Sequence, residues 1–343
     1  MNELAQFCKS QKKDFTPKIQ DTTRPVRYWS EKDILQGAIV DAYVIILRTQ
    51  GCFWARNSGC SMCGYFNDSL WDTVTDQDLI KQFNTAMKQY KNEQFVKIFT
   101  SGSFLDDNEI GSAVQNHILS TLYQSAKKIS VESRPEFITD KKLLSLQHLF
   151  LSKVFEVGIG LETANDVIRK YAINKGFSFK DYIQAAKVLK KNSIHCKTYL
   201  LAKPPFLTER EAIDDCIHTI KKIDKYADII SINPTNVQRN TAVDYLWKRS
   251  QFRPIWLWSI VEILKKSKTL TNAQIKCDIA GGGSRRGAHN CESCDGKILD
   301  AIAQFSLLQD PCVFNGLDCS CKNEWLDQLD IESLSFGSAI DLS

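Results

Sequence analysis

The amino-acid sequence predicts an α/β protein built on a parallel sheet, either an open, incomplete (β/α) barrel or a doubly wound sheet. Short β-rich apolar runs alternate with longer amphipathic segments through the middle of the chain, which is the pattern of repeated βα units. The 343 residues are 43% hydrophobic and 24% charged, as in ordinary globular proteins. The chain can therefore bury a large core, and disorder and collagen-like repeats are excluded.

Each expected strand is a short apolar run that ends in polar or glycine residues. The six strands are Val44–Leu47, Val96–Thr100, Ile129–Glu132, Phe155–Leu161, Cys196–Leu201 and Ile229–Ile232. The segments between them have helical periodicity and fit crossover helices: Asp76–Tyr90, Asp107–Ala126, Lys141–Phe150, Lys180–Lys190 and Glu209–Lys225. Thr75 and Thr208 mark two helix starts, because each precedes acidic residues in a first turn.

The βα alternation stops near Asn240. We therefore expect an N-terminal extension over residues 1–39, a βα core over residues 40–239 and a C-terminal substrate- or RNA-binding region over residues 240–343. No apolar run reaches the ~18 residues that a membrane span needs. The polar start of the chain, Met1 to Lys13, also lacks the apolar stretch of a signal peptide. These features indicate a cytoplasmic protein without a membrane partner.

Charge is unevenly distributed, although the net charge is only +4. From Arg239 to His289 there are ten Lys or Arg against three Asp or Glu, whereas from Ile298 to Ser343 one Lys stands against eight acidic residues. A second basic stretch runs from Lys9 to Arg27. Basic stretches commonly neutralise nucleic-acid phosphates. The alternative is a solvated surface that pairs with the acidic tail.

Twelve cysteines in a chain without a secretory signal favour metal binding over disulfides. Cys52, Cys60 and Cys63 follow the first expected strand with the spacing C-x7-C-x2-C. Three thiolates on one loop can ligate three irons of a 4Fe–4S cluster and leave the fourth iron open for a ligand that is not protein. A closed zinc site needs a fourth Cys or His, and none lies in this loop, so a zinc knuckle with a distant fourth ligand is the alternative.

A second group of cysteines lies near the end of the chain. A C-x2-C pair and a later C-x-C pair together supply the four thiolates of a closed tetrahedral zinc site: Cys291, Cys294, Cys319 and Cys321. Three other residues could substitute as ligands: Cys277, His289 and Cys312. A second iron–sulfur cluster and buried free thiols are the alternatives to zinc at this group.

The three-cysteine loop after the first strand resembles that of the radical S-adenosylmethionine superfamily. The usual spacing there is C-x3-C-x2-C, and longer first intervals occur in its Elongator-like branch. The resemblance implies a partial (β/α)6 barrel of the TIM type for the core. It also implies a catalytic 4Fe–4S cluster on Cys52, Cys60 and Cys63, with S-adenosylmethionine as the second cofactor.

The same resemblance implies S-adenosylmethionine-binding roles for residues at the ends of later strands and just after the cysteine loop. The expected contacts are the adenine for Tyr65, the amino group for Gly102 and Ser103, ribose hydroxyls for Glu132 and Glu162, and a carboxylate for Arg134. Taken singly, a Glu or Arg of this kind is more often a surface or ion-pair residue. Because these residues occur at successive strand ends and beside a cluster loop, each assignment makes the others more credible.

A Gly- and Arg-rich run, Gly281 to Gly287, leads into the second cysteine group. It lacks the Lys-Ser/Thr pair of a P-loop, so it is expected to contact a phosphate backbone or to be a plain loop. Together with the C-x7-C-x2-C loop, this run resembles the radical S-adenosylmethionine subunits of archaeosine synthases.

That resemblance implies a lyase that acts on position 15 of archaeal tRNA. It would cleave the carbon–nitrogen bond of the lysine adduct on 7-cyano-7-deazaguanosine through a 5′-deoxyadenosyl radical, leaving archaeosine. The implied partners are tRNA, the enzyme that attaches lysine to the modified base, and an electron donor. The lysine moiety needs a cation and an acceptor in its pocket, for which Arg169, Lys203 and Arg239 are candidates.

Two other functions stay open. One is an Elongator-type or other radical enzyme with a different RNA or small-molecule substrate. The other is a non-catalytic protein that binds zinc and nucleic acid, in which both cysteine groups are structural. The second predicts zinc at both cysteine groups and no cleavage of S-adenosylmethionine.

Overall fold

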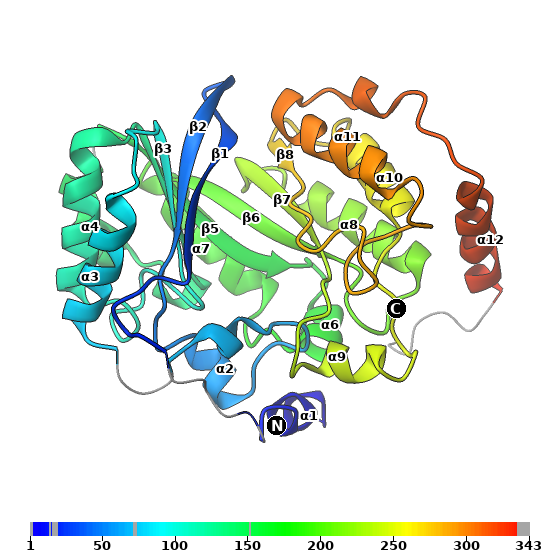
Figure 1. The fold of residues 1–343 in the computed structure, drawn as a ribbon, viewed down its shortest axis with the longest axis horizontal. Coiled ribbons are helices and arrows are strands. Elements are labelled where there is room, and N and C mark those ends of the chain that lie inside the picture. The colour runs from blue at the N-terminus through cyan, green and yellow to red at the C-terminus, as the bar shows by residue number, and fades with distance from the viewer. Residues whose placement is uncertain (1–2, 14, 16–19, 71–73, 151, 335–343) are drawn as a thin grey trace.

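The computed structural model describes residues 3–13, 15, 20–70, 74–150 and 152–334. These residues form one eight-stranded sheet in the order β1 to β8 (Figure 1). The strands are β1 (Arg27–Leu35), β2 (Ala38–Ile46), β3 (Phe95–Phe99), β4 (Lys128–Glu132), β5 (Val154–Glu162), β6 (His195–Ala202), β7 (Ile229–Pro234) and β8 (Gln274–Lys276). Strand β1 is the antiparallel half of a hairpin with β2, and β2 to β8 are parallel to their neighbours.

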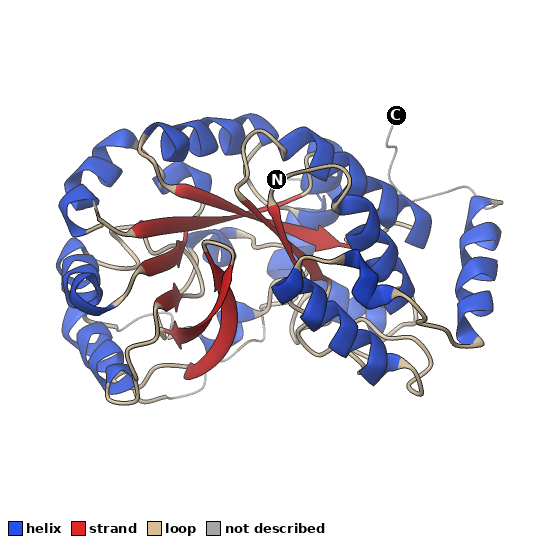
Figure 2. Ribbon diagram, turned by 90° about the horizontal axis from the view of Figure 1, so that it is seen from above, coloured by secondary structure: helices blue, strands red, loops and turns tan. Residues whose placement is uncertain are grey.

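This strand order decides between the two architectures that the sequence left open. A doubly wound sheet reverses its strand order at a switch point, whereas here each strand is added on the same side of the previous one. The sheet also curls strongly, with helices around its outer face (Figure 2). Side chains of its two edge strands meet across the interior, where Asp33 of β1 lies 2.6 Å from the Nζ of Lys276 on β8. The predicted partial barrel is therefore confirmed.

The helices are α1 (Glu3–Ser10), α2 (Phe53–Asn57), α3 (Asp76–Met87), α4 (Ser112–Ser125), α5 (Asp140–Leu146), α6 (Asp166–Ile168), α7 (Phe179–Lys191), α8 (Glu209–Ile223), α9 (Ala242–Trp247), α10 (Leu257–Ser267), α11 (Asp295–Leu308) and α12 (Cys321–Ser333). Both helix starts marked in the sequence are confirmed. Thr75 and Thr208 are the N-caps of α3 and α8, and each forms a capping box with an acidic residue three positions later. None of the helices in the described chain is long and apolar enough to cross a membrane.

The six predicted strands match β2 to β7, but the sequence did not indicate β1 or β8. Strand β1 mixes charged and apolar residues, and its first half is exposed, so it lacks a clear apolar run. Strand β8 has only three residues. It follows Asn240 in the chain and pairs with β7, so the sheet extends past the position where the βα alternation was expected to stop.

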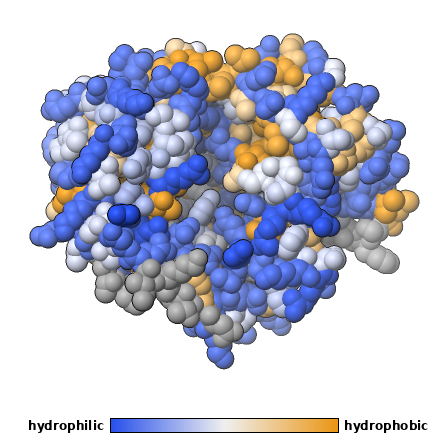
Figure 3. All heavy atoms as spheres, viewed as in Figure 1, coloured by the Kyte–Doolittle hydropathy of each residue, from blue (hydrophilic) through white to orange (hydrophobic). Residues whose placement is uncertain are grey.

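Charged side chains, rather than apolar ones, fill much of the inner face of the sheet. Lys97 pairs with Asp33, and Lys128 lies 2.6 Å from Glu156; all four of these residues are buried. The apolar core lies on the other side, between the sheet and the outer helices. Figure 3 shows the surface hollowed between the half that carries α3 and α4 and the half that carries α8 and α10. The inside of the barrel is thus polar, as a site for a polar ligand requires.

Candidate functional site

The loop between β2 and η1 (Tyr65–Asp68) carries Cys52, Cys60 and Cys63, and we call residues 52–63 the cysteine loop. All three thiols are half-buried. Burial raises the pKa of Cys63 to about 12, with smaller contributions from the charges of Cys60 and Cys52, so the three sulfurs are electrostatic neighbours. They do not, however, form a group with all sulfurs within 4.8 Å, as another set of described cysteines does. This wider arrangement suits three irons of one cluster better than a single ion.

The N-terminal segment holds the cysteine loop from outside. Lys12 donates from Nζ to the carbonyl oxygens of Ala55 at 2.7 Å and Ser58 at 2.8 Å, where the short helix α2 ends and its carbonyls lack helical partners. Gly59 has a φ of +86°, and a Cβ there would overlap Lys12 Nζ. The long first cysteine interval therefore accommodates a helix that a distant lysine caps. Nothing local in the sequence indicated this contact.

Gly102, after β3, packs directly on the cysteine loop. A Cβ on Gly102 would lie 2.9 Å from the Cα of Cys52 and would overlap the carboxylate of Glu109. Glu109 accepts hydrogen bonds of 2.6 Å from the backbone N–H of Ser103 and from the hydroxyl of Thr49. Burial raises the pKa of this carboxyl to about 7. The structure thus brings Gly102 and Ser103 to Cys52 and adds Glu109, which the sequence did not single out.

Arg134, after β4, lies in an aromatic cage that the cysteine loop helps to build. Its guanidinium carbon is 5.1 Å from the ring centre of Phe53, 5.6 Å from that of Trp54 and 5.2 Å from that of Phe177. Its Nε donates to Glu136 at 2.7 Å. Its Nη2 is buried and has no hydrogen-bond partner in the described structure. A buried donor of this kind is suited to a bound carboxylate.

Glu162 ends β5 in a strained position next to the cysteine loop. Its φ is +69°, at an irregularity of the β5–β6 pairing, and such conformations are uncommon for residues other than glycine. Lys175 lies 2.6 Å from its carboxylate, in space that a Cβ on Gly160 would fill. Burial raises the pKa of Cys60, and the positive charges of Lys175 and Arg134 partly offset this effect. Lys175 is therefore a further cation of the site.

Glu132, the last residue of β4, meets the side chain of Tyr199 across β5. Gly158 makes this possible, because a Cβ there would lie 2.8 Å from the Tyr199 ring. Burial raises the pKa of Glu132, and the contact with the Tyr199 hydroxyl lowers it. Tyr65, just after the cysteine loop, is 57% exposed, so its ring is open to a ligand. The predicted cofactor residues thus border one region around the cysteine loop.

Of the three cations considered for a lysine moiety, two are engaged elsewhere. Arg169 is buried and pairs with Asp166, and Lys203 lies 2.7 Å from the buried carboxylate of Glu209. Both therefore hold the fold together. Arg239 is exposed, and its backbone carbonyl accepts a hydrogen bond from Asn67 near the cysteine loop.

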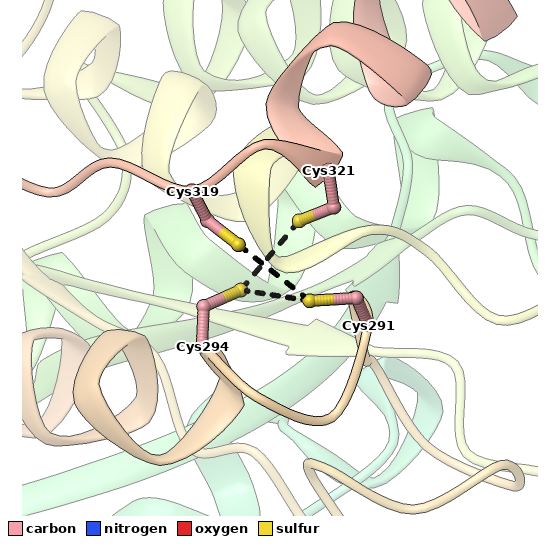
Figure 4. A group of neighbouring side chains, drawn as sticks. All are labelled: Cys291, Cys294, Cys319 and Cys321. Carbon is pink, nitrogen blue, oxygen red and sulfur yellow. Dashed lines mark hydrogen bonds between the residues drawn. The ribbon is translucent and has the colours of Figure 1, made fainter.

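The four cysteines preferred for a metal site converge in the structure, and we call them the C-terminal cysteine group (Figure 4). The sulfur of Cys291 lies 3.7 Å from that of Cys294 and 3.6 Å from that of Cys319, and Cys294 and Cys321 are 3.6 Å apart. Four thiolates bound to one zinc ion at about 2.3 Å lie about 3.8 Å from one another. The group could therefore hold a single metal ion. Cys277, His289 and Cys312 lie outside it.

Neighbouring side chains donate to the sulfurs of this group. The indole N–H of Trp258 lies 3.3 Å from Cys321 Sγ, and the Asn290 amide nitrogen lies 3.4 Å from Cys294 Sγ. The hydroxyl of Ser293 lowers the pKa of Cys291 to about 6. Donors aimed at sulfur stabilise thiolates, the form that binds metal. The sequence indicated the four cysteines but not these supporting residues. Trp258 is far from the cysteines in the sequence, and Asn290 and Ser293 belong to no recognisable motif of their own.

The Gly281–Gly287 run packs beside the end of β7. Arg286 is held in place, because its Nη2 lies 2.5 Å from Asp244 and its guanidinium stacks on Trp247. Arg285 is exposed. Of these two arginines, only Arg285 is thus exposed, as the predicted contact with a phosphate backbone requires.

No family model matches the chain. It is 39% identical over 328 residues to archaeosine synthase subunit beta of Methanosarcina acetivorans, covering 94% of this chain and 95% of that protein. It is 37% identical over 306 residues to archaeosine synthase subunit beta of Thermococcus kodakarensis, covering 87% and 94%. A solved structure, the archaeal Methanocaldococcus infernus Elp3 with an N-terminal deletion, aligns with a TM-score of 0.47 and 15% identity over 66% of this chain and 59% of that chain.

Both sequence relatives exceed one third identity, and the alignments span nearly their full lengths. The alignment with the Methanosarcina acetivorans protein covers 94% of the chain, and it therefore includes the cysteine loop, Gly102 and the C-terminal cysteine group. The chain therefore belongs to the archaeosine synthase subunit beta family.

Proposed function

We propose that this protein is a radical S-adenosylmethionine enzyme that completes archaeosine at position 15 of tRNA. Its substrate is the lysine adduct of 7-cyano-7-deazaguanosine, in which it cleaves a carbon–nitrogen bond of the lysine moiety. One observation carries the proposal: a three-cysteine loop packed on Gly102, in a chain whose near full-length relatives are archaeosine synthase β subunits. The proposed partners are tRNA, the subunit that attaches the lysine, and an electron donor, all in the cytoplasm.

Cys52, Cys60 and Cys63 are the residues that would hold a 4Fe–4S cluster. The test of fit is their arrangement, half-buried and close enough for their charges to interact, yet too wide for one ion. When bound, such a cluster supplies the electron that splits S-adenosylmethionine into methionine and a 5′-deoxyadenosyl radical. The chain's own task is to bind and orient both reactants and to exclude water. Lys12 serves this task by fixing the outer side of the loop.

The residues around the loop supply complementary groups for S-adenosylmethionine. The free Nη2 of Arg134 suits its carboxylate, and the turn at Gly102 and Ser103 suits its amino group. The carboxylates of Glu132 and Glu162 suit ribose hydroxyls, and the exposed ring of Tyr65 suits the adenine: these roles extend the sequence prediction. Lys175 is a second cation beside Cys60. S-adenosylmethionine carries both positive and negative charges, and the site offers both carboxylates and cationic side chains.

For the C-terminal cysteine group we propose zinc, because its sulfur spacing matches the edge of a zinc–thiolate tetrahedron. A closed set of four thiolates leaves no coordination position for a substrate, so its role is structural. It would hold residues 291–321 together next to the exposed Arg285. We propose the preceding stretch, Arg239 to His289, as the tRNA-binding surface, because it carries ten Lys or Arg against three acidic residues and includes Arg285.

The test is 5′-deoxyadenosine formation by anaerobically reconstituted, reduced protein with S-adenosylmethionine and tRNA that carries or lacks the lysine adduct. Strong stimulation by the adduct is expected, with loss of all cleavage in Cys60→Ala. Slow turnover that ignores the adduct would point to a radical enzyme with another substrate. No turnover in a preparation with a verified cluster would favour a zinc- and nucleic-acid-binding protein.

A further inference from the structure

One buried lysine of the described chain has no anionic partner. Five lysines are at most 7% exposed, and four of them lie within 2.7 Å of a carboxylate: Lys97, Lys128, Lys203 and Lys276. The fifth, Lys197, is 4% exposed, and in the described structure its ammonium has neither an ion pair nor a hydrogen bond. Its Nζ lies 4.6 Å from the centre of the Tyr199 ring. An unpaired buried charge is costly and persists where it serves another purpose.

The ammonium of Lys197 lies inside the barrel at the level of the cofactor site. In the sheet register Glu132 of β4 is opposite Gly158 of β5, which is opposite Lys197 of β6, so the three residues share the inner face. Gly158 has no side chain, so the space over it lies between Glu132 and Lys197, and the Tyr199 ring packs there. Tyr199, two residues after Lys197 on the same face, leans over this space toward Glu132.

Both carboxylates near Lys197 already have other partners. Glu156 lies 2.6 Å from Lys128 and also accepts from Ser130, and Glu132 meets Tyr199. The positive charge of Lys197 lowers the pKa of Glu132 and of Glu156, so it is near both, but neither comes within ion-pair distance. The ammonium is therefore stabilised at long range and is left free to bind an anion.

We propose that Lys197 binds the carboxylate of the amino-acid moiety of the substrate. This inference rests on the proposed function, in which the substrate is a lysine adduct. The lysine moiety of the substrate carries a carboxylate, and a carboxylate pairs well with an ammonium in polar surroundings. Lys197 takes the role for which Arg169 and Lys203 are unsuited, since those two are held in ion pairs.

The first test measures stability without any substrate. Lys197→Met removes an unpaired charge and should keep or raise the melting temperature of the protein. The matched variant Lys128→Met removes an equally buried lysine but leaves Glu156 unpaired, so it should lower the melting temperature. If Lys197→Met lowers it as much as Lys128→Met does, Lys197 is a structural residue and the proposal is wrong.

The second test compares two tRNA substrates: one with the lysine adduct, the other with a pentane-1,5-diamine adduct that lacks only the carboxylate. The wild-type protein should have a KM for the lysine adduct at least about tenfold lower, the value of one charged contact. Lys197→Met should lose this preference, and a variant of the exposed Lys187, Lys187→Met, should keep it. Retention of the preference by Lys197→Met would overturn the proposal.

The two proposals can fail separately. If the wild-type protein acts on neither tRNA, the proposed function fails, and binding of free amino acid then decides the role of Lys197. L-lysine at millimolar concentration should raise the melting temperature of wild type but not of Lys197→Met, and pentane-1,5-diamine should raise neither. No increase in the wild type with L-lysine would reject the carboxylate site itself.

Discussion

Replacing Gly102 by alanine is expected to separate the cysteine loop from the end of β3. The new Cβ would overlap the Glu109 carboxylate and lie 2.9 Å from the Cα of Cys52. Real Cβ atoms do not approach other heavy atoms so closely, so Glu109 or the loop backbone must move. The expected result is a less stable protein that retains a cluster poorly.

The size of the effect follows from what has to move. Rotating Glu109 away gives up its hydrogen bonds to the Ser103 N–H and the Thr49 hydroxyl, both 2.6 Å. Bonds to charged groups contribute about 1.5–3 kcal/mol each, and overpacking costs about 1–3 kcal/mol. Because the chain will take the cheaper of these movements, we expect Gly102→Ala to lower the free energy of unfolding by about 1–3 kcal/mol.

The assay is urea unfolding of the metal-free protein, together with iron content after anaerobic reconstitution. Gly296→Ala is the matched control, because it lies in α11 and its Cβ would meet nothing within 4 Å. That control should be neutral or about 0.5–1 kcal/mol more stable. Should Gly102→Ala unfold like wild type and bind full iron, the packing of Gly102 on Cys52 is not what positions the loop.

Three further predictions concern other parts of the molecule. Lys12→Met removes the cap of α2, so the cluster absorbance of this variant should decay faster in air than that of a control variant at the exposed Lys13, Lys13→Met. Equal decay of the two variants would show that Lys12 does not protect the cluster. Cys294→Ala should lose the metal bound at the C-terminal cysteine group and melt at a lower temperature, which metal analysis and calorimetry measure. Burial raises the pKa of Asp215 from 3.8 to about 6, with a smaller opposing effect of the Thr163 hydroxyl, so the folded protein holds a proton that the unfolded chain has released. The unfolding free energy of wild type relative to Asp215→Asn should therefore fall as pH rises from about 4 to about 6 and then level off, and a flat difference would contradict this reasoning.

Periodicity predicted the six central strands because each contains a short run rich in buried β-branched and other apolar residues, bounded by polar residues or glycine. It did not predict β1, whose residues Glu31 and Asp33 point into a polar barrel interior and pair with Lys97. An inner face built from ion pairs breaks the apolar pattern on which strand prediction depends.

The sequence by itself determined the features that are local in the chain: the strand and helix periods, the capping residues and the spacing of both cysteine groups. Cys291, Cys294, Cys319 and Cys321 could be named as one set because metal ligands recur at short, characteristic intervals. Features of this kind can be predicted from the sequence because they depend only on residues that are close together in the chain.

Only the tertiary structure decided which side chains meet across the barrel. It placed Lys12 on the end of α2, Gly102 on Cys52 and Trp258 on Cys321, and it left Lys197 without a carboxylate. Each of these facts depends on strand register and on contacts between residues far apart in sequence. Whether a buried charge is paired is set by distances of a few ångströms in space, and sequence spacing carries no information about them.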